Sequence, residues 1–352
     1  MAWKLMKGNE AIAKSAIDSG CLFYSGYPIT PQTEITEYMA RNLSKFGGTF
    51  VQAESEIAAI SMIYGASGAG VRTMTSSSSP GISLKAEGIS YLAASDLPCV
   101  IVNIVRGGPG LGNVQPAQSD YFQAVKGMGH GDYKIIVYAP HTVQEAFDIT
   151  AIAFEKSDEY LMPCMIMGDG TLGQMMEVVE VKEECEKKLK SFKKPWIVDG
   201  TKRKRLKNVI KSIYINAKEL EKAIVARQKR YDIVSKNEIM YEEFMTDDAE
   251  IIIVSYGIVA RIAKTAINIA REKGIKLGLI RPITLWPFPA EIFKKNHGTV
   301  KKYFVVELSM GQMVEDVKLS VNGRKPVYFY GRTGGMIPTE EEVLSEVIKI
   351  RN

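Results

Sequence analysis

Histidine and cysteine are scarce in this chain of 352 residues, which contains three histidines and four cysteines. The histidines stand far apart, and neither a CxxC pair nor any other spacing typical of zinc or iron–sulfur sites occurs. The sequence therefore predicts no metal centre within the chain. We expect reduced, separately buried thiols at Cys21, Cys99, Cys164 and Cys185.

Long apolar runs are also missing. No stretch approaches the ~18–20 residues that span a bilayer, and the first residues, MAWKLMKGNEAIAK, are too polar for a secretory signal. We therefore expect a cytoplasmic protein that does not contact membranes. The net charge is only +5, with acids and bases interspersed. The basic run 202–205 has no aromatic or glycine interleaving, which favours a solvated linker over a nucleic-acid site.

The chain is rich in alternating strand and helix patterns. Up to about residue 176, apolar runs such as LPCVIVNIV alternate with helical repeats such as GNEAIAKSAIDSG, and this order predicts a doubly wound parallel sheet. A lysine-rich stretch follows that we predict to be helical and poor in strands, and the alternation then returns. The predicted parts are an α/β domain at 1–178, a charged helical linker at 179–246 and a smaller α/β domain at 247–352.

Two loops of the first domain carry candidate binding residues, because ligands of parallel sheets bind beyond the carboxyl ends of the strands. In SGYPITPQT, two prolines stiffen the loop around Thr30, which suits the binding of a carboxylate, although an ordinary proline-bounded turn explains the pattern equally well. Arg106 follows the strand LPCVIVNIV, and its guanidinium suits a carboxylate. A salt bridge that caps the sheet is the alternative.

Two glutamates open the apolar stretch VQAESEIAAISMIYGASGAG. Residues two apart lie on opposite faces of a helix, so Glu54 and Glu56 cannot share one environment there. Glu54 suits the positive end of the helix dipole. Glu56 precedes a run of isoleucine, alanine and methionine, where a carboxylate either pairs or has a raised pKa. A carboxyl group of this kind is suited to sharing a proton with a ring nitrogen of a cofactor.

Two glycine-rich motifs fit dinucleotide binding poorly. That fingerprint needs G-x-G-x-x-G between a strand and the helix that it opens. GASGAG ends a helix instead, and GGPGLG leads into NVQPAQSD, which resists a helix. A nicotinamide-linked dehydrogenase is therefore the weaker alternative.

The motifs together resemble one family over nearly the whole chain. The stretches SGYPITPQTEI, VQAESEIAAISMIYGASGAG, TSSSSPGISLKAEGISYLA, LPCVIVNIVRGGPGLGNVQPAQSDYFQAVKGMGHGD and RPITLWPFP are similar to the α subunit of 2-oxoacid:ferredoxin oxidoreductases. The similarity is closest to the branched-chain (2-oxoisovalerate) type. It implies a domain like the pyrimidine-binding domain of thiamine diphosphate enzymes, followed by a domain like the C-terminal domain of transketolase.

The resemblance also assigns roles to residues. It implies that Glu56 hydrogen-bonds the pyrimidine ring of thiamine diphosphate, that Thr30 and Arg106 hold the substrate carboxylate, and that the neighbouring Tyr27, Pro28 and Ile29 contact the cofactor. The implied reaction is the oxidative decarboxylation of a 2-oxoacid to acyl-CoA and CO₂, with electrons passed to ferredoxin. The favoured substrate is 3-methyl-2-oxobutanoate, and 2-oxoglutarate and pyruvate stay open.

The resemblance implies partner subunits as well. Thiamine diphosphate enzymes hold the diphosphate and its metal with a GDG motif and a downstream asparagine, but the next asparagine after Gly168-Asp169-Gly170 is Asn208, so we interpret this GDG as a tight turn. A β subunit would then supply the diphosphate site and Mg²⁺, and γ and ferredoxin-like δ subunits would complete an assembly whose partner subunits carry the iron–sulfur clusters.

Two points stay open at this stage. A non-catalytic assembly subunit with the same fold is the main alternative to an enzyme subunit. The acyl pocket is expected to involve the loops 25–33, 75–82 and 107–133, in which Tyr121 and His130 are candidates.

Overall fold

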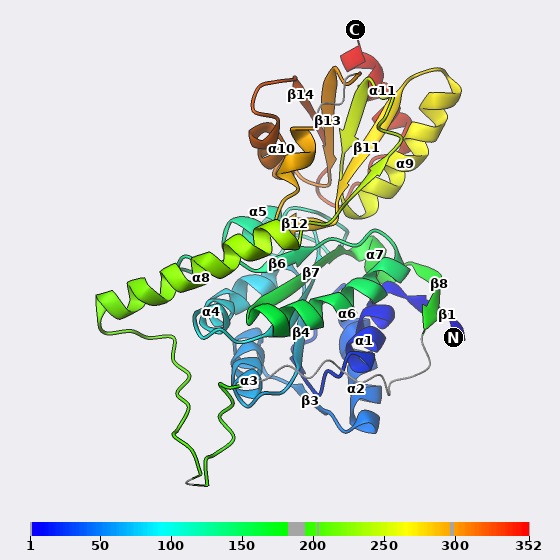
Figure 1. Cartoon of the computed structure of the whole chain (residues 1–352). Coiled ribbons are helices and arrows are strands. Elements are labelled where there is room, and N and C mark those ends of the chain that lie inside the picture. The colour runs from blue at the N-terminus through cyan, green and yellow to red at the C-terminus, as the bar shows by residue number, and fades with distance from the viewer. Residues whose placement is uncertain (1, 182–193, 203, 296–298, 352) are drawn as a thin grey trace.

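The computed structural model describes residues 2–181, 194–202, 204–295 and 299–351. Figure 1 shows two α/β units, a larger one that contains the first half of the chain and a smaller one built by its last third. The thiols of Cys21, Cys99 and Cys164 are free and buried, as predicted, whereas Cys185 lies outside the described residues. Within the described part of the chain, no helix is long and apolar enough to cross a bilayer.

The larger unit is built on a seven-stranded sheet in the order β12-β6-β7-β5-β4-β2-β3. All neighbouring strands are parallel except β12, which pairs antiparallel with β6. The predicted parallel sheet is therefore confirmed. The strands are β2 (Phe23–Gly26), β3 (Thr49–Gln52), β4 (Thr73–Ser77), β5 (Cys99–Val105), β6 (Ile136–Tyr138), β7 (Pro163–Asp169) and β12 (Thr284–Trp286).

Helices cover both faces of this sheet. In β5, Ile101 and Val105 pack into one core cluster with α3 and α4, while Val102 and Ile104 pack into a second cluster with α1, α2 and α6. Successive side chains of a strand point to opposite faces, so a strand covered on both sides reads as a continuous apolar run. The helices are α1 (Gly8–Asp18), α2 (Thr33–Asn42), α3 (Glu56–Gly68), α4 (Ser79–Ala94), α5 (Tyr121–Lys126), α6 (Val143–Tyr160) and α7 (Gly170–Gln174), with a 3-10 turn, η1 (Leu43–Phe46).

The smaller unit has a five-stranded sheet in the order β14-β13-β10-β11-β9. Only β9 runs antiparallel to its neighbour. A helix with apolar residues on one side, α9 (Gly257–Glu272), packs on this sheet together with α11 (Glu340–Arg351). The other elements are β9 (Tyr241–Phe244), β10 (Ile251–Val254), β11 (Leu277–Pro282), β13 (Lys302–Glu307), β14 (Val327–Gly331), α10 (Met313–Val321) and the 3-10 turn η2 (Ala290–Phe293).

The region between the two units departs from the prediction. Residues 176–181, which we predicted to be helical, form β8 (Met176–Val181) and pair antiparallel with β1 (Ala2–Lys7). That prediction is wrong because the strand partner lies far away in the sequence. Residues 194–216 have no regular helix where they are described, whereas α8 (Ala217–Asn237) fulfils the helical prediction. The division into three parts at residues 178 and 246 stays a prediction. The strand β12 comes from the predicted third part but belongs to the sheet of the first.

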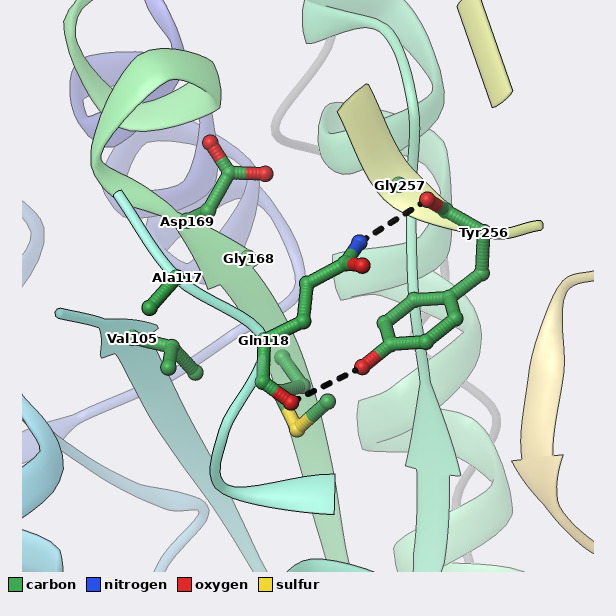
Figure 2. A pocket seen from close by; sticks show the side chains of 8 residues that line it. Val105, Ala117, Gln118, Gly168, Asp169, Tyr256 and Gly257 are labelled. Carbon is green, nitrogen blue, oxygen red and sulfur yellow. Dashed lines mark hydrogen bonds between the residues drawn. The ribbon is translucent and has the colours of Figure 1, made fainter. Parts of the chain in front are cut away.

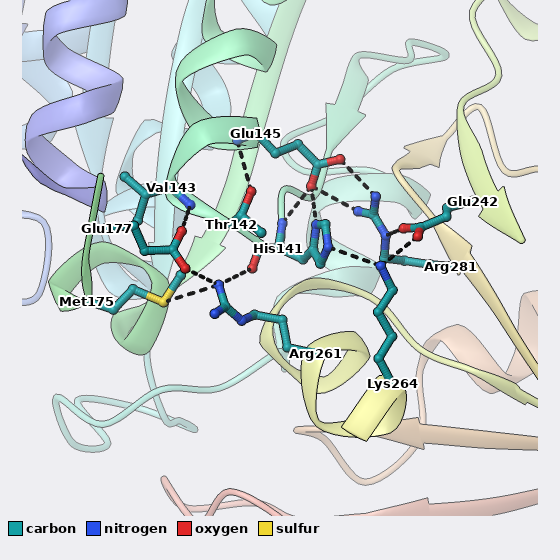
Figure 3. Close-up of polar contacts among 10 residues, drawn as sticks. All are labelled: His141, Thr142, Val143, Glu145, Met175, Glu177, Glu242, Arg261, Lys264 and Arg281. Carbon is teal, nitrogen blue, oxygen red and sulfur yellow. Dashed lines mark hydrogen bonds and ion pairs between the residues drawn. The ribbon is translucent and has the colours of Figure 1, made fainter. Parts of the chain in front are cut away.

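A cluster of ion pairs joins the two units (Figure 3). Arg281 of β11 donates to both carboxylate oxygens of Glu145 on α6, at 3.0 and 2.9 Å, and to Glu242 of β9 at 2.7 Å. Burial opposes the charge of Glu145, but hydrogen bonds from His141 and Arg281 outweigh it and lower the pKa of Glu145 to about 2. We call this group the interdomain cluster; it comprises His141, Glu145, Glu177, Glu242, Arg261, Lys264 and Arg281.

Candidate active site

The first turn of α3 holds the predicted glutamate. Ser55 caps the helix, since its hydroxyl accepts a hydrogen bond from the Ala58 amide at 3.2 Å. Glu56 is the first helical residue and is only 6% exposed, whereas Glu54 lies before the helix and is exposed. The prediction that the two carboxylates occupy different environments is confirmed.

The carboxylate of Glu56 is seated against α4 without a hydrogen-bond donor among the described residues. Gly81 makes the seat possible, because a Cβ atom at that position would lie 2.6 Å from Glu56 Oε1 and 2.0 Å from Ser77 Oγ. The hydroxyl of Ser77 lies on the same side of Gly81, and within the described part of the chain neither it nor the buried hydroxyl of the adjacent Ser78 has a partner. We call Glu56, Ser77, Ser78 and Gly81 the Glu56 site. Buried polar groups without partners are rare in folded proteins, so this arrangement indicates a ligand.

Sequence reasoning missed Lys85, which follows Gly81 by one helical turn on α4. Its side chain is fully buried. The ammonium donates to Thr75 Oγ1 at 2.8 Å and to the Ser76 carbonyl at 2.9 Å. Burial lowers the pKa of Lys85 to about 7, against the opposing effect of the Glu56 charge. The signal in the sequence was the spacing: Lys85 follows Gly81 by four residues, and residues four apart lie on the same face of a helix.

The structure brings the two predicted carboxylate-binding residues together. Arg106, just after β5, donates from Nη1 to the Thr30 carbonyl at 3.0 Å and from Nη2 to the Leu111 carbonyl at 3.1 Å. Its Nε is buried and has no partner. The backbone amide of Arg106 is fixed by Ser79 of α4, whose hydroxyl accepts from it at 3.1 Å. Arg106 is therefore bound to the loop that carries Thr30, and no carboxylate of the described residues pairs with it.

The other predicted contact residues occupy the tip of the loop between β2 and α2. Tyr27, Pro28 and Thr30 are exposed, and Ile29 is half-buried. Beneath them lies a hydrogen-bonded network that the sequence analysis did not identify. Gln32 accepts from Ser76 at 2.5 Å, and Ser76 also bonds the hydroxyl of Tyr24 at 2.6 Å. This network fixes the base of the loop to β4, next to Lys85.

The GDG motif ends β7 and opens α7, as Figure 2 shows. Asp169 accepts hydrogen bonds from the amides of Thr171 and Leu172 at 2.8 and 3.1 Å, and a further one from Ile258. Burial raises its pKa to about 6 despite these bonds. Its oxygens are thus used to cap helices, and no group of metal-ligating side chains occurs in the described ranges. The interpretation of GDG as a tight turn is therefore wrong in its local structure: the motif passes directly from strand to helix, with Asp169 as the cap of α7.

Tyr121, a candidate for the acyl pocket, lies elsewhere. It is fully buried, and its hydroxyl donates to Asp316 of α10 at 2.6 Å, so it joins the two units instead of lining an open pocket. His130 is exposed in the loop after α5, and its role stays a prediction.

The fold is that of an α/β protein, and a family profile places the chain in the thiamine diphosphate-binding class. A sequence profile described as pyruvate flavodoxin/ferredoxin oxidoreductase, thiamine diphosphate-binding, matches residues 14–253, and one described as pyruvate:ferredoxin oxidoreductase core domain II matches residues 249–343. The chain belongs to the pyruvate flavodoxin/ferredoxin oxidoreductase family. The family resemblance predicted from the sequence is thereby confirmed, and with it the oxidoreductase class and thiamine diphosphate as the cofactor of the class.

Individual relatives agree with this assignment. The chain is 47% identical to the ketoisovalerate oxidoreductase subunit VorB of Methanothermobacter marburgensis, with 99% of this chain and 98% of the relative covered. It is 36% identical to the 2-oxoglutarate synthase subunit KorA of Methanocaldococcus jannaschii, over 99% of this chain and 100% of the relative.

Solved structures show the same fold. A 2-oxoglutarate:ferredoxin oxidoreductase from Magnetococcus marinus, with 2-oxoglutarate, coenzyme A and succinyl-CoA bound, superposes with a TM-score of 0.86 and 26% identity. The match covers 99% of this chain and 65% of that chain, so the relative carries further parts. A split-gene transketolase, an inactive β4 tetramer, matches with a TM-score of 0.60 and 13% identity, which shows the fold alone.

Proposed function

We propose that this chain binds the aminopyrimidine half of thiamine diphosphate and that Glu56 is the residue that contacts the ring nitrogen. The observation that carries the proposal is the buried residue Glu56, whose carboxylate accepts no hydrogen bond from a described group and lies with the unpartnered Ser77 hydroxyl around Gly81. A carboxylate in such a place is stabilised by a protonated ring nitrogen. Bound thiamine diphosphate supplies carbanion chemistry at the 2-oxo carbon.

We propose that Arg106 and Thr30 hold the carboxylate of the substrate. The guanidinium of Arg106 lies at the end of β5. Two of its nitrogens donate to the carbonyls of Thr30 and Leu111, and Nε has no partner among the described residues. Fixing the substrate at its carboxylate places the neighbouring 2-oxo group in one orientation, which lowers the entropic cost of the attack. The exposed residues Tyr27 and Pro28, with Ile29, would complete the cofactor contact.

The reaction that we propose consumes a 2-oxoacid and coenzyme A, releases CO₂ and acyl-CoA, and passes an electron pair to ferredoxin one electron at a time. The favoured substrate is 3-methyl-2-oxobutanoate, because the two relatives named ketoisovalerate oxidoreductase subunits are 47% and 45% identical to the chain. The subunits named for 2-oxoglutarate are 35–36% identical, and one named for pyruvate is 28% identical. These two acids are the alternative substrates.

We further propose that a β subunit supplies the diphosphate site and Mg²⁺, and that iron–sulfur clusters reside on partners that include a γ and a ferredoxin-like δ subunit, all in the cytoplasm. Exposed apolar side chains support a partner on two surfaces. Ile57 of α3 and Leu84 of α4 flank the Glu56 site and are 56% and 52% exposed. Leu206 and Ile215, on the extended segment before α8 (Figure 1), are 91% and 92% exposed.

An assay of the purified native complex tests the function. We expect oxidation of the 2-oxoacid to depend on coenzyme A and on thiamine diphosphate, with reduction of ferredoxin or viologen as the readout. The kcat/KM should be highest for 3-methyl-2-oxobutanoate. A higher kcat/KM for 2-oxoglutarate or pyruvate would reassign the substrate. The extended segment is tested in the same complex with the double variant Ile213→Ser and Ile215→Ser. We expect this variant to lose its co-purified subunits. The control is Leu319→Ser on α10, a similarly exposed apolar position, which should retain them.

A non-catalytic assembly subunit is the second candidate. It predicts that the complex keeps its turnover when the Glu56 site is altered, because the chemistry would then lie on other subunits.

A further inference from the structure

Lys85 occupies a position that the proposed chemistry leaves unexplained. A fully buried ammonium is costly, because an ion loses its hydration in the protein interior. Lys85 is fully buried on α4, and burial lowers its pKa to about 7, although the charge of Glu56 acts in the opposite direction. Packing alone is an insufficient reason for a lysine here, because an apolar side chain of similar length would fill the space without this cost.

The contacts of Lys85 hold it beneath the Glu56 site. Thr75 Oγ1 already donates to the Ser25 carbonyl at 2.7 Å, so it accepts from Lys85, and the Ser76 carbonyl accepts as well. An ammonium has three donors, and these two acceptors use two of them. On α4, Lys85 follows Gly81 by one turn, so both lie on the face that meets Glu56.

The geometry points to Lys85 as a positioning residue for Glu56: its buried cation, one turn from Gly81, attracts the carboxylate and holds it in place until the ring nitrogen of the cofactor becomes its partner. The inference rests on the proposed role of Glu56. Without this cation, the carboxylate would have no partner of opposite charge within the described helix pair and could turn away toward water. The network through Ser76 and Gln32 also connects Lys85 to the base of the loop that carries Thr30.

The test measures cofactor binding and not turnover. In the reconstituted complex, dissociation constants are measured for thiamine diphosphate and for an analogue in which carbon replaces the ring nitrogen that would face Glu56. We expect the native complex to prefer thiamine diphosphate by at least ~tenfold, because a hydrogen bond to a charged group is lost with the analogue. In Lys85→Met, we expect the preference to shrink to about threefold or less.

A matched control separates this role from a structural one. Ser67 is buried on the same helix as Glu56, three turns away, and donates to the Pro98 carbonyl at 2.7 Å. Ser67→Ala removes a buried hydrogen bond of the same domain and should leave the preference unchanged. If Lys85→Met weakens the binding of cofactor and analogue equally, Lys85 only supports the fold and the inference is overturned.

Two further outcomes are kept distinct. Glu56→Gln should abolish the preference; if it does not, the proposed role of Glu56 fails, whatever Lys85 does. Where Lys85→Met does not yield a folded chain, Thr75→Val serves instead, because it removes one of the two acceptors and retains the lysine. We expect a smaller loss of the preference in Thr75→Val, and an unchanged preference in that folded variant contradicts the inference.

Discussion

The interdomain cluster and the Glu56 site both place charged groups out of water, and they differ in how completely those groups are paired. In the interdomain cluster, Glu145 accepts from Arg281 and shares a 2.6 Å contact with His141, and Glu242 accepts from Arg281 and Lys264 (Figure 3). In the Glu56 site, the buried hydroxyls of Ser77 and Ser78 have no partner among the described residues, and the carboxylate lies where Gly81 leaves room for it. A fully paired cluster holds a fold together, whereas an incomplete one indicates a missing ligand.

The largest expected effect is on turnover, and it comes from a change in the Glu56 site. We expect Glu56→Gln to lower turnover of the assembled complex by about 10²–10⁴-fold, because the variant cannot exchange a proton with the ring nitrogen. Thermal stability of the isolated chain should fall somewhat, since the negative charge that acts on the buried Lys85 ammonium is removed. Glu54→Gln, which is exposed and only two residues away, is the control and should leave turnover intact. Turnover that survives in Glu56→Gln would support the assembly-subunit alternative.

For the interdomain cluster, we expect a loss of stability without a loss of turnover. Arg281 has a side chain only 3% exposed and contacts two carboxylates. Arg281→Met should lower the free energy of unfolding by about 2–3 kcal/mol, because two half-buried carboxylates lose their shared guanidinium and keep only His141 and Lys264 as partners. Turnover per folded complex should stay constant. Lys294→Met breaks an exposed pair with Glu291 and should cost less than about 1 kcal/mol in denaturant unfolding. A loss of turnover in folded Arg281→Met would show that the two clusters are coupled.

Acid should distinguish the clusters next. The pKa of Glu145 in the folded chain is about 2, below its ordinary value of 4.5, so the unfolded chain binds more protons between these values. Its contribution to stability is complete above about pH 5 and is lost as the pH falls through 4.5 toward 2. We expect a loss of about 2 kcal/mol, measured by denaturant unfolding at successive pH values. In Glu145→Gln this part of the pH dependence should disappear; an unchanged curve would contradict the assignment.

The smallest effect concerns the guanidinium of Arg106. We expect Arg106→Lys to raise KM for the 2-oxoacid by about tenfold, because lysine lacks the planar fork that binds a carboxylate with two hydrogen bonds. The Kd for thiamine diphosphate should not change. Steady-state kinetics together with cofactor titration check this expectation. A change in cofactor affinity without a change in KM would place Arg106 at the cofactor.

Local sequence was sufficient for most elements of the first unit. Its strands are buried on both faces and therefore appear as apolar runs, and its helices carry clear start signals such as Ser55 before Glu56. The pair β1 and β8 was missed, because each strand is stabilised by the other across the length of the domain. The place of β12 in the first sheet depends on its contact with β6, a distant segment that local patterns do not indicate.

The candidate site shows the same division. The types and order of residues sufficed to select Thr30, Glu56 and Arg106, because short motifs fix which side chains follow the strand ends. Lys85 and the network around Ser76 could not be selected, because a lysine within a helix usually faces water and only the packing of α4 on β4 buries this one.

By itself, the sequence determined the family, the double α/β architecture and the three side chains around which the function is proposed, since these depend on local patterns of residues. Only the tertiary structure decided which charges are paired. Ion pairs such as Glu145 with Arg281 join residues 136 positions apart. The Glu56 carboxylate fits against α4 because Gly81 has no Cβ atom there. Whether a buried charge supports the fold or binds a ligand depends on its neighbours in space, and those are set by packing.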